Sequence, residues 1–244
     1  MLKEGARVKE KRMSSEERKQ YILSSVRNLI CTKGLNVTSK ELAEAAGVSE
    51  ALIYKHFESK EGLYAALMEK SCRGADRVGH ELAELEPSTQ ILVFSVYLLV
   101  HTIFGGMENP DEDFALSPEE FTGLLLQSFQ TDGEIARTLF KQGLGPWVPY
   151  FHKHMEAAQK SGDLIKQTAD FETLVWFMHH ATMGLKITMH PTPDTLMIQN
   201  TDEDKLKNFL MSFLLRGIGL KQEAIDEHLK SNEFKQFKQK LAGK

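Results

Sequence analysis

Hydroxyl, aromatic and cationic side chains gather between residues 38 and 60, and their types suit contacts to a nucleic acid. Thr38, Ser39 and Lys40 can offer hydroxyls, backbone N–H groups and a positive charge to a phosphate. Further side chains in the same stretch could contact base edges or the phosphate backbone, namely Ser49, Glu50, Ala51, Leu52, Tyr54, Lys55, His56 and Lys60. The chemistry indicated is hydrogen bonding and charge pairing with DNA rather than bond making.

Two short helices joined by a tight turn would position these groups. The spacing predicts a helix over 38–46 that stops at Gly47, since glycine tolerates a left-handed turn. Val48 would then pack under the turn, and Ser49 would cap a second helix over 50–56. The N-terminal end of that second helix could point into the major groove of DNA.

The neighbouring segments carry helix signals of their own. Ser14 followed by Glu17 has the spacing of a capping box, which predicts the start of a first helix. Gly34 is expected to end that helix. Ser59 is expected to cap a fourth helix, so a compact helical unit should surround the turn.

Read in order, these residues resemble the signature of the TetR family of transcription regulators. The matching residues are Gly47, Val48, Ser49, Ile53, Tyr54, His56, Phe57, Lys60 and Leu63. The match extends over residues 14–70. It implies an all-α protein, with a helix-turn-helix DNA-binding domain over 14–74 and an effector-binding and dimerisation domain over 75–244.

The resemblance also implies roles for single residues. Tyr54 and Lys60 look like the family's phosphate clamps, and His56 stands where the family often places another backbone contact. The variable positions that read the bases would be Glu50, Ala51, Leu52 and Lys55. Glutamate could accept from cytosine N4 and leucine could touch a thymine methyl, or either could face solvent beside the groove.

Charge is unevenly divided along the chain. The net charge is −4, yet residues 1–60 carry 12 Lys/Arg against 8 Asp/Glu, whereas residues 61–244 carry 18 against 26. A basic first part on an acidic second part fits a protein that touches phosphates at one end. The chain contains no uncharged apolar stretch long enough to predict a membrane span. Cys31 and Cys72 do not have the spacing of a CxxC motif. We therefore expect free thiols and a cytoplasmic protein.

The second part is expected to consist of long apolar helices. The spacing predicts them over 89–104, 118–129, 134–160, 171–189 and 202–220. Gly145 and Pro146 should break the third of these. The tail from residue 221 is polar and predicts a final surface helix.

Aromatic and sulfur-containing residues of these helices are candidates for an effector pocket. They would suit an apolar ligand, although packing in the core explains many of them equally well. The candidates are Phe104, Met107, Phe121, Leu125, Phe129, Trp147, Phe151, Met155, Trp176, Phe177, His180 and Met183.

The last two apolar helices could form the seam of a homodimer, because their apolar stripes must be buried against something. The residues expected there are Leu174, Ala181, Gly184, Leu206, Phe209, Leu210, Phe213, Leu214 and Gly217. Burial in the core of the same subunit is the alternative. A symmetric dimer would place two reading helices one turn of DNA apart, on a palindromic operator.

The sequence gives little support for a metal site or for catalysis. His152 and His154, like His179 and His180, diverge on a helix and have no cysteine at zinc-like spacing, so neither a metal nor a cofactor is expected. No nucleophile elbow, metalloprotease motif or phosphate loop is present. We therefore expect a DNA-binding regulator, and more specifically a repressor that a small effector releases from its operator. An enzyme, or a DNA-binding activator without an effector, are the alternatives.

Overall fold

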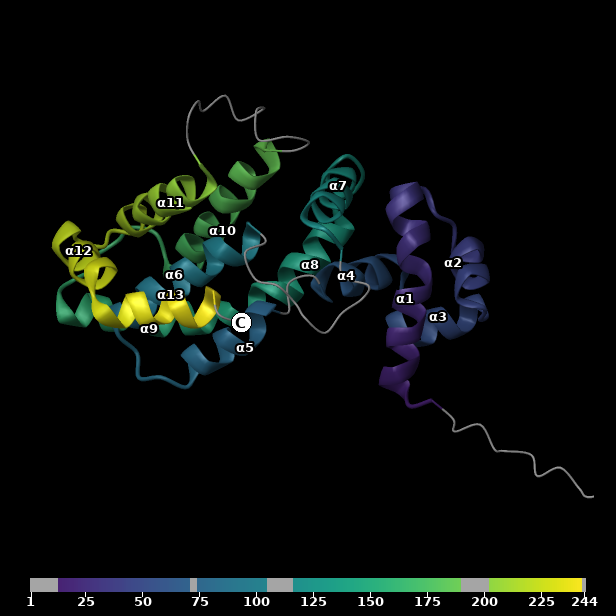
Figure 1. Ribbon diagram of the computed structural model, residues 1–244, viewed down its shortest axis with the longest axis horizontal. Helices are drawn as coiled ribbons and strands as arrows, with labels where there is room; N and C mark the ends of the chain where they lie inside the picture. The colour runs from purple at the N-terminus through teal and green to yellow at the C-terminus, as the bar shows by residue number, and fades with distance from the viewer. Residues whose placement is uncertain (1–12, 71–73, 105–115, 190–201, 243–244) are drawn as a thin grey trace, which may run out of the picture.

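The chain is described by a computed structural model over residues 13–70, 74–104, 116–189 and 202–242. Within these ranges it forms helices and no strand, so the expected all-α fold class is confirmed. Figure 1 shows α1, α2 and α3 at one end of the molecule and the helices from α9 to α13 at the other, with α4, α7 and α8 between them.

The N-terminal lobe consists of α1 (Ser15–Lys33), the 3₁₀ turn η1 (Gly34–Asn36), α2 (Ser39–Ala46), α3 (Glu50–Phe57) and α4 (Lys60–Lys70). The capping box expected at the start of α1 is present. Glu17 N–H donates to Ser14 Oγ, and Ser14 N–H donates to the Glu17 carboxylate. Such caps satisfy N–H groups that a helix start otherwise leaves unpaired.

The apolar residues of this lobe form a core that continues into two helices of the second part. Ile22, Ile53 and Leu63 are almost fully buried in it. The same cluster includes residues of α7 (Pro118–Phe129) and α8 (Glu134–Gly143). Within the described residues, α4 packs along α8 more extensively than any other pair of elements. The N-terminal lobe is therefore joined to the second part of the chain mainly through the contact between α4 and α8.

The larger lobe is arranged around α6 (Thr89–Ile103). Its other elements are α5 (Gly74–Ala83), η2 (Gly145–Trp147), α9 (Val148–Ser161), α10 (Phe171–Thr188), α11 (Glu203–Gly217), α12 (Gln222–Lys230) and α13 (Asn232–Ala242). Helices α5, α9, α10, α11 and α12 all contact α6. Such all-round contact explains why α6 is apolar on most of its faces.

The predicted break at Gly145 and Pro146 is confirmed, since α8 ends at Gly143 and α9 begins at Val148. Two features differ from the expectation. Helix α5 was not predicted. The tail forms two helices instead of one, and Phe234 and Phe237 of α13 are buried against Phe94, with ring centroids 5.6 and 4.6 Å away. The tail is therefore part of the core of the larger lobe.

None of the helices in the described ranges combines the length and apolarity needed to cross a lipid bilayer. Cys31 is a half-buried free thiol. Burial and the neighbouring Glu120 raise its pKa to about 11, so it remains protonated near neutral pH. Cys72 lies outside the described residues.

Candidate nucleic-acid interface and ligand cavity

The turn between α2 and α3 has the backbone geometry that the sequence predicts. Gly47 adopts φ 61° and ψ 33°, the left-handed region, and its N–H donates to the carbonyls of Ala43 and Glu44. No atom lies within 4 Å of where a Cβ at this position would stand. The backbone angle alone therefore favours glycine here.

Helix α3 buries one face and exposes the other. Ser49 caps it, with its Oγ accepting from Leu52 N–H at 3.2 Å. Ile53 and Phe57 are buried in the core of the lobe. The residues expected to read bases lie on the remaining surface, with Glu50, Ala51 and Lys55 exposed and Leu52 half-buried. The exposed face begins at the helix N-terminus, which is the end that enters a groove in helix-turn-helix proteins.

The start of α2 lies beside α3 and is held by side-chain hydrogen bonds. Thr38 and Glu41 form a capping box, so the Thr38 hydroxyl is committed to the helix start. The Ser39 hydroxyl is bonded to the Tyr54 hydroxyl, which links α2 to α3. Lys40 is exposed and lies 3.9 Å from Glu44. The Ser39–Tyr54 pair sets the position of α2 relative to α3.

Two further candidates for DNA contact also have contacts within the lobe. Lys60 Nζ donates to the Leu35 carbonyl at 2.8 Å and lies 5.7 Å from the centre of the Tyr64 ring. His56 Nδ1 lies 3.5 Å from Ser15 Oγ. Lys60 thus braces the turn before α2, and a lysine ammonium has three protons to donate.

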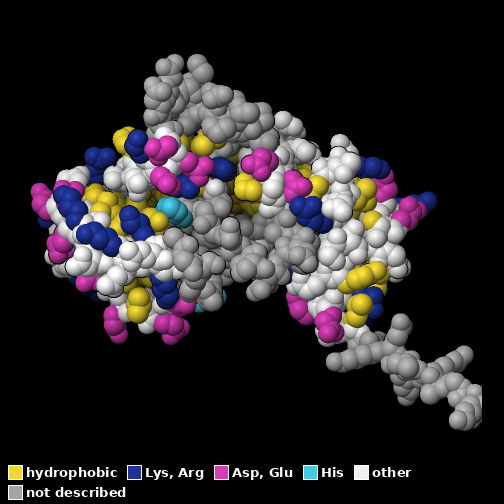
Figure 2. Space-filling view, viewed as in Figure 1, with side chains coloured by type: hydrophobic (Ala, Val, Ile, Leu, Met, Phe, Trp, Pro, Cys, Tyr) yellow, Lys and Arg dark blue, Asp and Glu magenta, His cyan; other side chains and the backbone are white. Residues whose placement is uncertain are grey.

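Charge around the N-terminal lobe is mixed. Figure 2 shows acidic and basic side chains interspersed over the visible face of both lobes. Within α3, Glu50 stands in the first turn and Lys55 in the last. On this visible face the described Lys and Arg side chains of the N-terminal lobe do not form a continuous patch.

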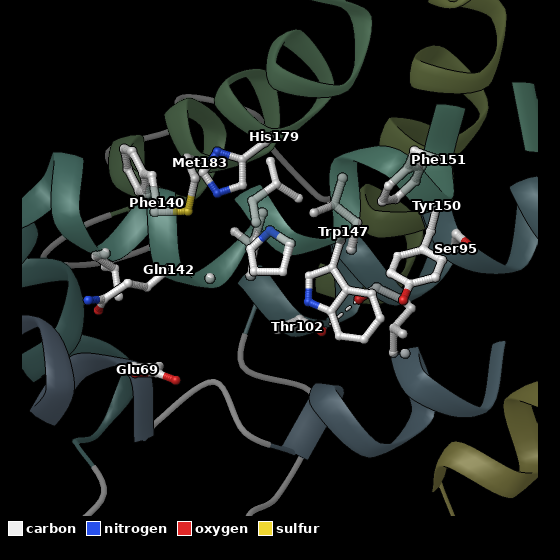
Figure 3. A pocket seen from close by; sticks show the side chains of 18 of the residues that line it. Glu69, Ser95, Thr102, Phe140, Gln142, Trp147, Tyr150, Phe151, His179 and Met183 are labelled. Carbon is white, nitrogen blue, oxygen red and sulfur yellow. Dashed lines mark hydrogen bonds between the residues drawn. The ribbon is translucent and has the colours of Figure 1, made fainter. Parts of the chain in front are cut away.

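A cavity of about 440 Å³ lies in the larger lobe, between α5, α6, α7, α8, η2, α9 and α10, and Glu69 of α4 also lines it. Its walls are mostly apolar, with Trp147 and Tyr150 on one side and Phe140 with Met183 on another (Figure 3). A volume of this size is typical of small-molecule sites. Trp147 packs closely on α5, since a Cβ added at Gly79 would stand 2.8 Å from its ring. The missing side chain at Gly79 therefore allows Trp147 to form this wall.

Some of the expected pocket residues line this cavity, namely Phe121, Trp147, Phe151 and Met183. Three others, Phe104, Leu125 and Met155, are buried in the two cores, and Trp176 is half-buried. The outward-facing ones are Phe129, Phe177 and His180. Met107 lies outside the described residues. The division follows from helix rotation, because residues six apart, such as Phe177 and Met183, stand about 120° apart around the axis of α10 and so face different surroundings.

Several lining residues were not predicted, above all His80, Phe140, Tyr150, His154 and His179. Helical spacing could have found three of them. His179 stands four residues before Met183, and Tyr150 stands three after Trp147. His154 stands three after Phe151, so each of the three shares a face with a residue that was predicted.

Three buried or half-buried histidines are held in their neutral form. Burial lowers the pKa of His179 to about 4, with a smaller contribution from His180, and burial also lowers the pKa of His101 to about 4. His154 has a lowered pKa because of burial and the nearby Lys153. His154 and His179 therefore present neutral imidazoles to the cavity near neutral pH. Within the described residues, no group of three or more His, Cys, Asp or Glu could hold a metal ion.

Mild acid is expected to destabilise the protein. An unfolded histidine binds a proton near pH 6.5, whereas folded His179 binds it only near pH 4. Between these values the unfolded state holds more protons, so stability falls as the pH falls. For His179 alone the loss from pH 7 to pH 5 is about 2 kcal/mol. Urea denaturation at both pH values should show this loss, and His179→Leu should reduce it. Equal pH dependence in both proteins would contradict the assignment.

The outer faces of α10 and α11 carry exposed aromatic residues. Phe177 is 71% exposed, Phe209 is 64% exposed and Phe213 is 55% exposed. The other residues expected in the dimer seam lie partly in the core of the lobe and partly at its surface. Leu206, Leu210 and Leu214 are buried in the lobe's own core, Leu174 and Ala181 are half-buried, and Gly184 and Gly217 are exposed. Phe209 and Phe213 thus leave large apolar side chains on neighbouring turns of α11 exposed in the single chain.

Comparison with known families finds one match in the N-terminal lobe. Residues 22–67 match the model of "Bacterial regulatory proteins, tetR family". These residues span most of α1, all of α2 and α3, and most of α4. No curated protein matches the chain in sequence.

Solved structures of similar fold cover most of the chain. RolR in complex with resorcinol is 18% identical, with a TM-score of 0.52, over 89% of this chain and 95% of that one. FadR from Bacillus subtilis in complex with stearoyl-CoA is 17% identical, with a TM-score of 0.54, over 81% and 98%. The flavonoid-responsive regulator FrrA is 18% identical, with a TM-score of 0.53, over 84% and 98%. At these identities the likeness establishes the fold.

Proposed function

We propose that this chain is a DNA-binding transcription regulator of the tetR type, and more specifically a repressor that a small molecule releases from its operator. The match of residues 22–67 to the model of bacterial regulatory proteins of the tetR family supports this. The observation that carries the proposal is the exposed face of α3 behind the Gly47 turn. In this proposal residues 14–74 bind DNA, and residues 75–244 bind the effector and form the dimer.

The DNA contacts follow from the exposure and chemistry of the N-terminal lobe. Ala51 and Lys55 would meet base edges, and Leu52 would reach a thymine methyl. Lys40 and the hydroxyl pair of Ser39 and Tyr54 would contact the phosphate backbone. The other proposed contacts are Thr38, Ser49, Glu50, His56 and Lys60. Among them Lys60 would act from the position in which it braces the Leu35 carbonyl.

The cavity in the larger lobe would hold the effector. Its apolar walls and volume support this role, as do similar folds whose structures carry resorcinol or stearoyl-CoA. Leu139 and Phe140 of α8 line the cavity, and α8 packs along α4. A ligand that favours a shifted α8 would move α4 and with it α3. The coupling needs only a difference in ligand affinity between the two arrangements.

A homodimer would give the regulator two reading helices. The exposed Phe177, Phe209 and Phe213 support a seam built from the outer faces of α10 and α11. A two-fold axis through such a seam requires an operator with inverted half-sites. The inward-facing leucines of α11 would support the seam from beneath, by fixing that helix on α6.

The proposal is tested by coupling DNA binding to ligand binding. A duplex selected from a random library by the purified protein would be labelled, and its fluorescence anisotropy followed while a compound library is added. We expect at least one compound to release the duplex and to raise the melting temperature of the DNA-free protein. Leu99 lines the cavity, so Leu99→Phe should narrow it. This variant should release less of the duplex when the compound is added, while its affinity for the duplex without the compound stays unchanged. A compound that raises the melting temperature yet leaves the duplex bound would favour a regulator that is not released by its ligand.

A further inference from the structure

Two imidazoles in the cavity wall are almost completely buried. His154 of α9 is 3% exposed and His179 of α10 is 7% exposed, and both line the cavity. Figure 3 shows His179 on the α10 side of the cavity, near Phe140 and Met183. Buried polar atoms usually have hydrogen-bond partners, and an atom without one indicates a missing partner.

One nitrogen of His154 is occupied and fixes the other. Ser88 N–H donates to His154 Nδ1 at 3.4 Å, so in the neutral ring Nε2 carries the proton. Within the described residues this Nε2–H has no hydrogen-bond acceptor. His154 therefore presents an unused donor in a buried position.

His179 is in a related situation. Its Nδ1 lies 3.1 Å from His180 Nδ1, so these two nitrogens share one proton. The Nε2 of His179 makes no hydrogen bond to the part of the chain that is described. Because His180 is exposed to solvent, either ring can carry the shared proton. The Nε2 of His179 is thus an acceptor in one tautomer and a donor in the other.

The other polar groups of the walls complete the pattern. The hydroxyls of Ser95, Thr102 and Thr122 each donate to a carbonyl of their own helix at 2.8 Å. The hydroxyls of Ser95 and Thr122 can still accept a hydrogen bond from a ligand. Together, the two imidazoles and these hydroxyls offer acceptors, one fixed donor at His154 and one group at His179 that can do either. A hydroxyl group, which both donates and accepts, matches every one of these groups.

The charges in the walls do not favour a charged ligand. Glu69 and Lys186 are the only carboxylate and the only ammonium among the described lining residues, and both are half-buried. Lys186 Nζ lies 5.6 Å from the centre of the Phe104 ring. Moving an anion into apolar walls without a buried cation beside it is costly.

Building on the function proposed above, we propose that the effector is an uncharged ring compound with at least two hydroxyl groups, bound by Nε2 of His154 and Nε2 of His179. The rings of Trp147, Phe140 and Tyr150 pack against its ring. Its hydroxyls satisfy the two imidazoles, and the threonine and serine hydroxyls accept from it. The specificity of the site lies in these hydrogen bonds, because apolar walls discriminate weakly between ligands of similar shape.

Calorimetry on the DNA-free protein tests this with three probes of one shape, 2,6-dihydroxynaphthalene, its dimethyl ether and 2-naphthoate. The diol is expected to bind at least about tenfold more tightly than the other two. His154→Leu and His179→Leu should each lower the affinity for the diol by roughly tenfold and leave that for the ether unchanged. His179→Gln, which keeps a donor and an acceptor, should retain more affinity than His179→Leu. His152→Leu, an exposed histidine on the same helix as His154, should bind like the wild type.

The inference is overturned if the ether or the naphthoate binds as tightly as the diol. It is also overturned if both leucine variants bind the diol like the wild type, or if millimolar diol does not bind. Affinity of the wild-type and His152→Leu proteins for the selected duplex is measured separately without probes. A failure to bind any duplex would contradict the proposed function and leave the calorimetric result on the ligand class standing.

Discussion

Ala51→Glu is expected to lower the affinity for a selected operator duplex by roughly a hundredfold. Ala51 lies on the exposed face of α3, in the turn that would enter the major groove. A glutamate there adds a negative charge facing the phosphates and a longer side chain where the helix must approach the bases. Because Ala51 is exposed, the fold should be unaffected, and the melting temperature should stay close to that of the wild type.

Gln159→Glu is the matched control for this substitution. Gln159 is exposed on α9, in the larger lobe, and its replacement adds the same charge to the protein. Anisotropy titrations of both variants separate the effect of placing the charge on α3 from the effect of the more negative net charge. Equal affinities of Ala51→Glu and wild type, with both proteins folded, would remove α3 from the DNA interface.

Replacing Phe209 and Phe213 together with glutamate is expected to convert the protein from a dimer to a monomer. The two rings stand one turn apart on the outer face of α11 and are more than half exposed in the single chain. Four carboxylates across a two-fold seam would be desolvated without partners, which costs several kcal/mol. A monomer engages one half-site only, so affinity for a two-site operator should fall by two orders of magnitude or more, on the order of 10² to 10⁴.

Light scattering after size exclusion gives the mass of each species, and anisotropy gives the operator affinity. Phe129→Glu is the control, because Phe129 is 50% exposed but lies on α7, away from the proposed seam. It should remain a dimer. A double variant that keeps the dimer mass would show that subunits associate through another surface.

The N-terminal lobe could be predicted because its signals are local. A cap and its partner stand three residues apart, as in Ser14 with Glu17, and the turn at Gly47 depends on one backbone angle. Short-range spacing therefore gave the bounds of α1 to α3 within one residue. Missing α5 has a local cause too, since glycines at 74 and 79 weaken a helical pattern.

The cavity could be predicted only in part, because its lining depends on the rotation of eight elements around their axes. Met183 and His179 face inward together, whereas His180 and Phe177 on the same helix face outward. In an apolar helix, composition alone does not tell which face is inside. Of the two residues that stand three and four positions before the lining Met183, only His179 lines the cavity, since His180 faces outward.

The sequence alone could not show which residues of the wide apolar stripe of α11 face the core and which face outward. Leu206, Leu210 and Leu214 face the core, and Phe209 with Phe213 face outward, yet all five are apolar at helical spacing. A helix between a core and a partner is apolar on both sides. Only the packing of α11 on α6 separates the two sets.

The most direct test of the regulator assignment is the dependence of duplex affinity on half-site spacing and on salt. The full chain would be titrated against its selected inverted repeat, and against the same duplex with about five base pairs inserted between the half-sites, which is half a helical turn. We predict tight binding to the first, a loss of at least about a hundredfold on the second, and an affinity that falls steeply as salt rises. Equal affinity for both duplexes, or an affinity that salt does not change, would contradict the account of two α3 helices reading one face of DNA.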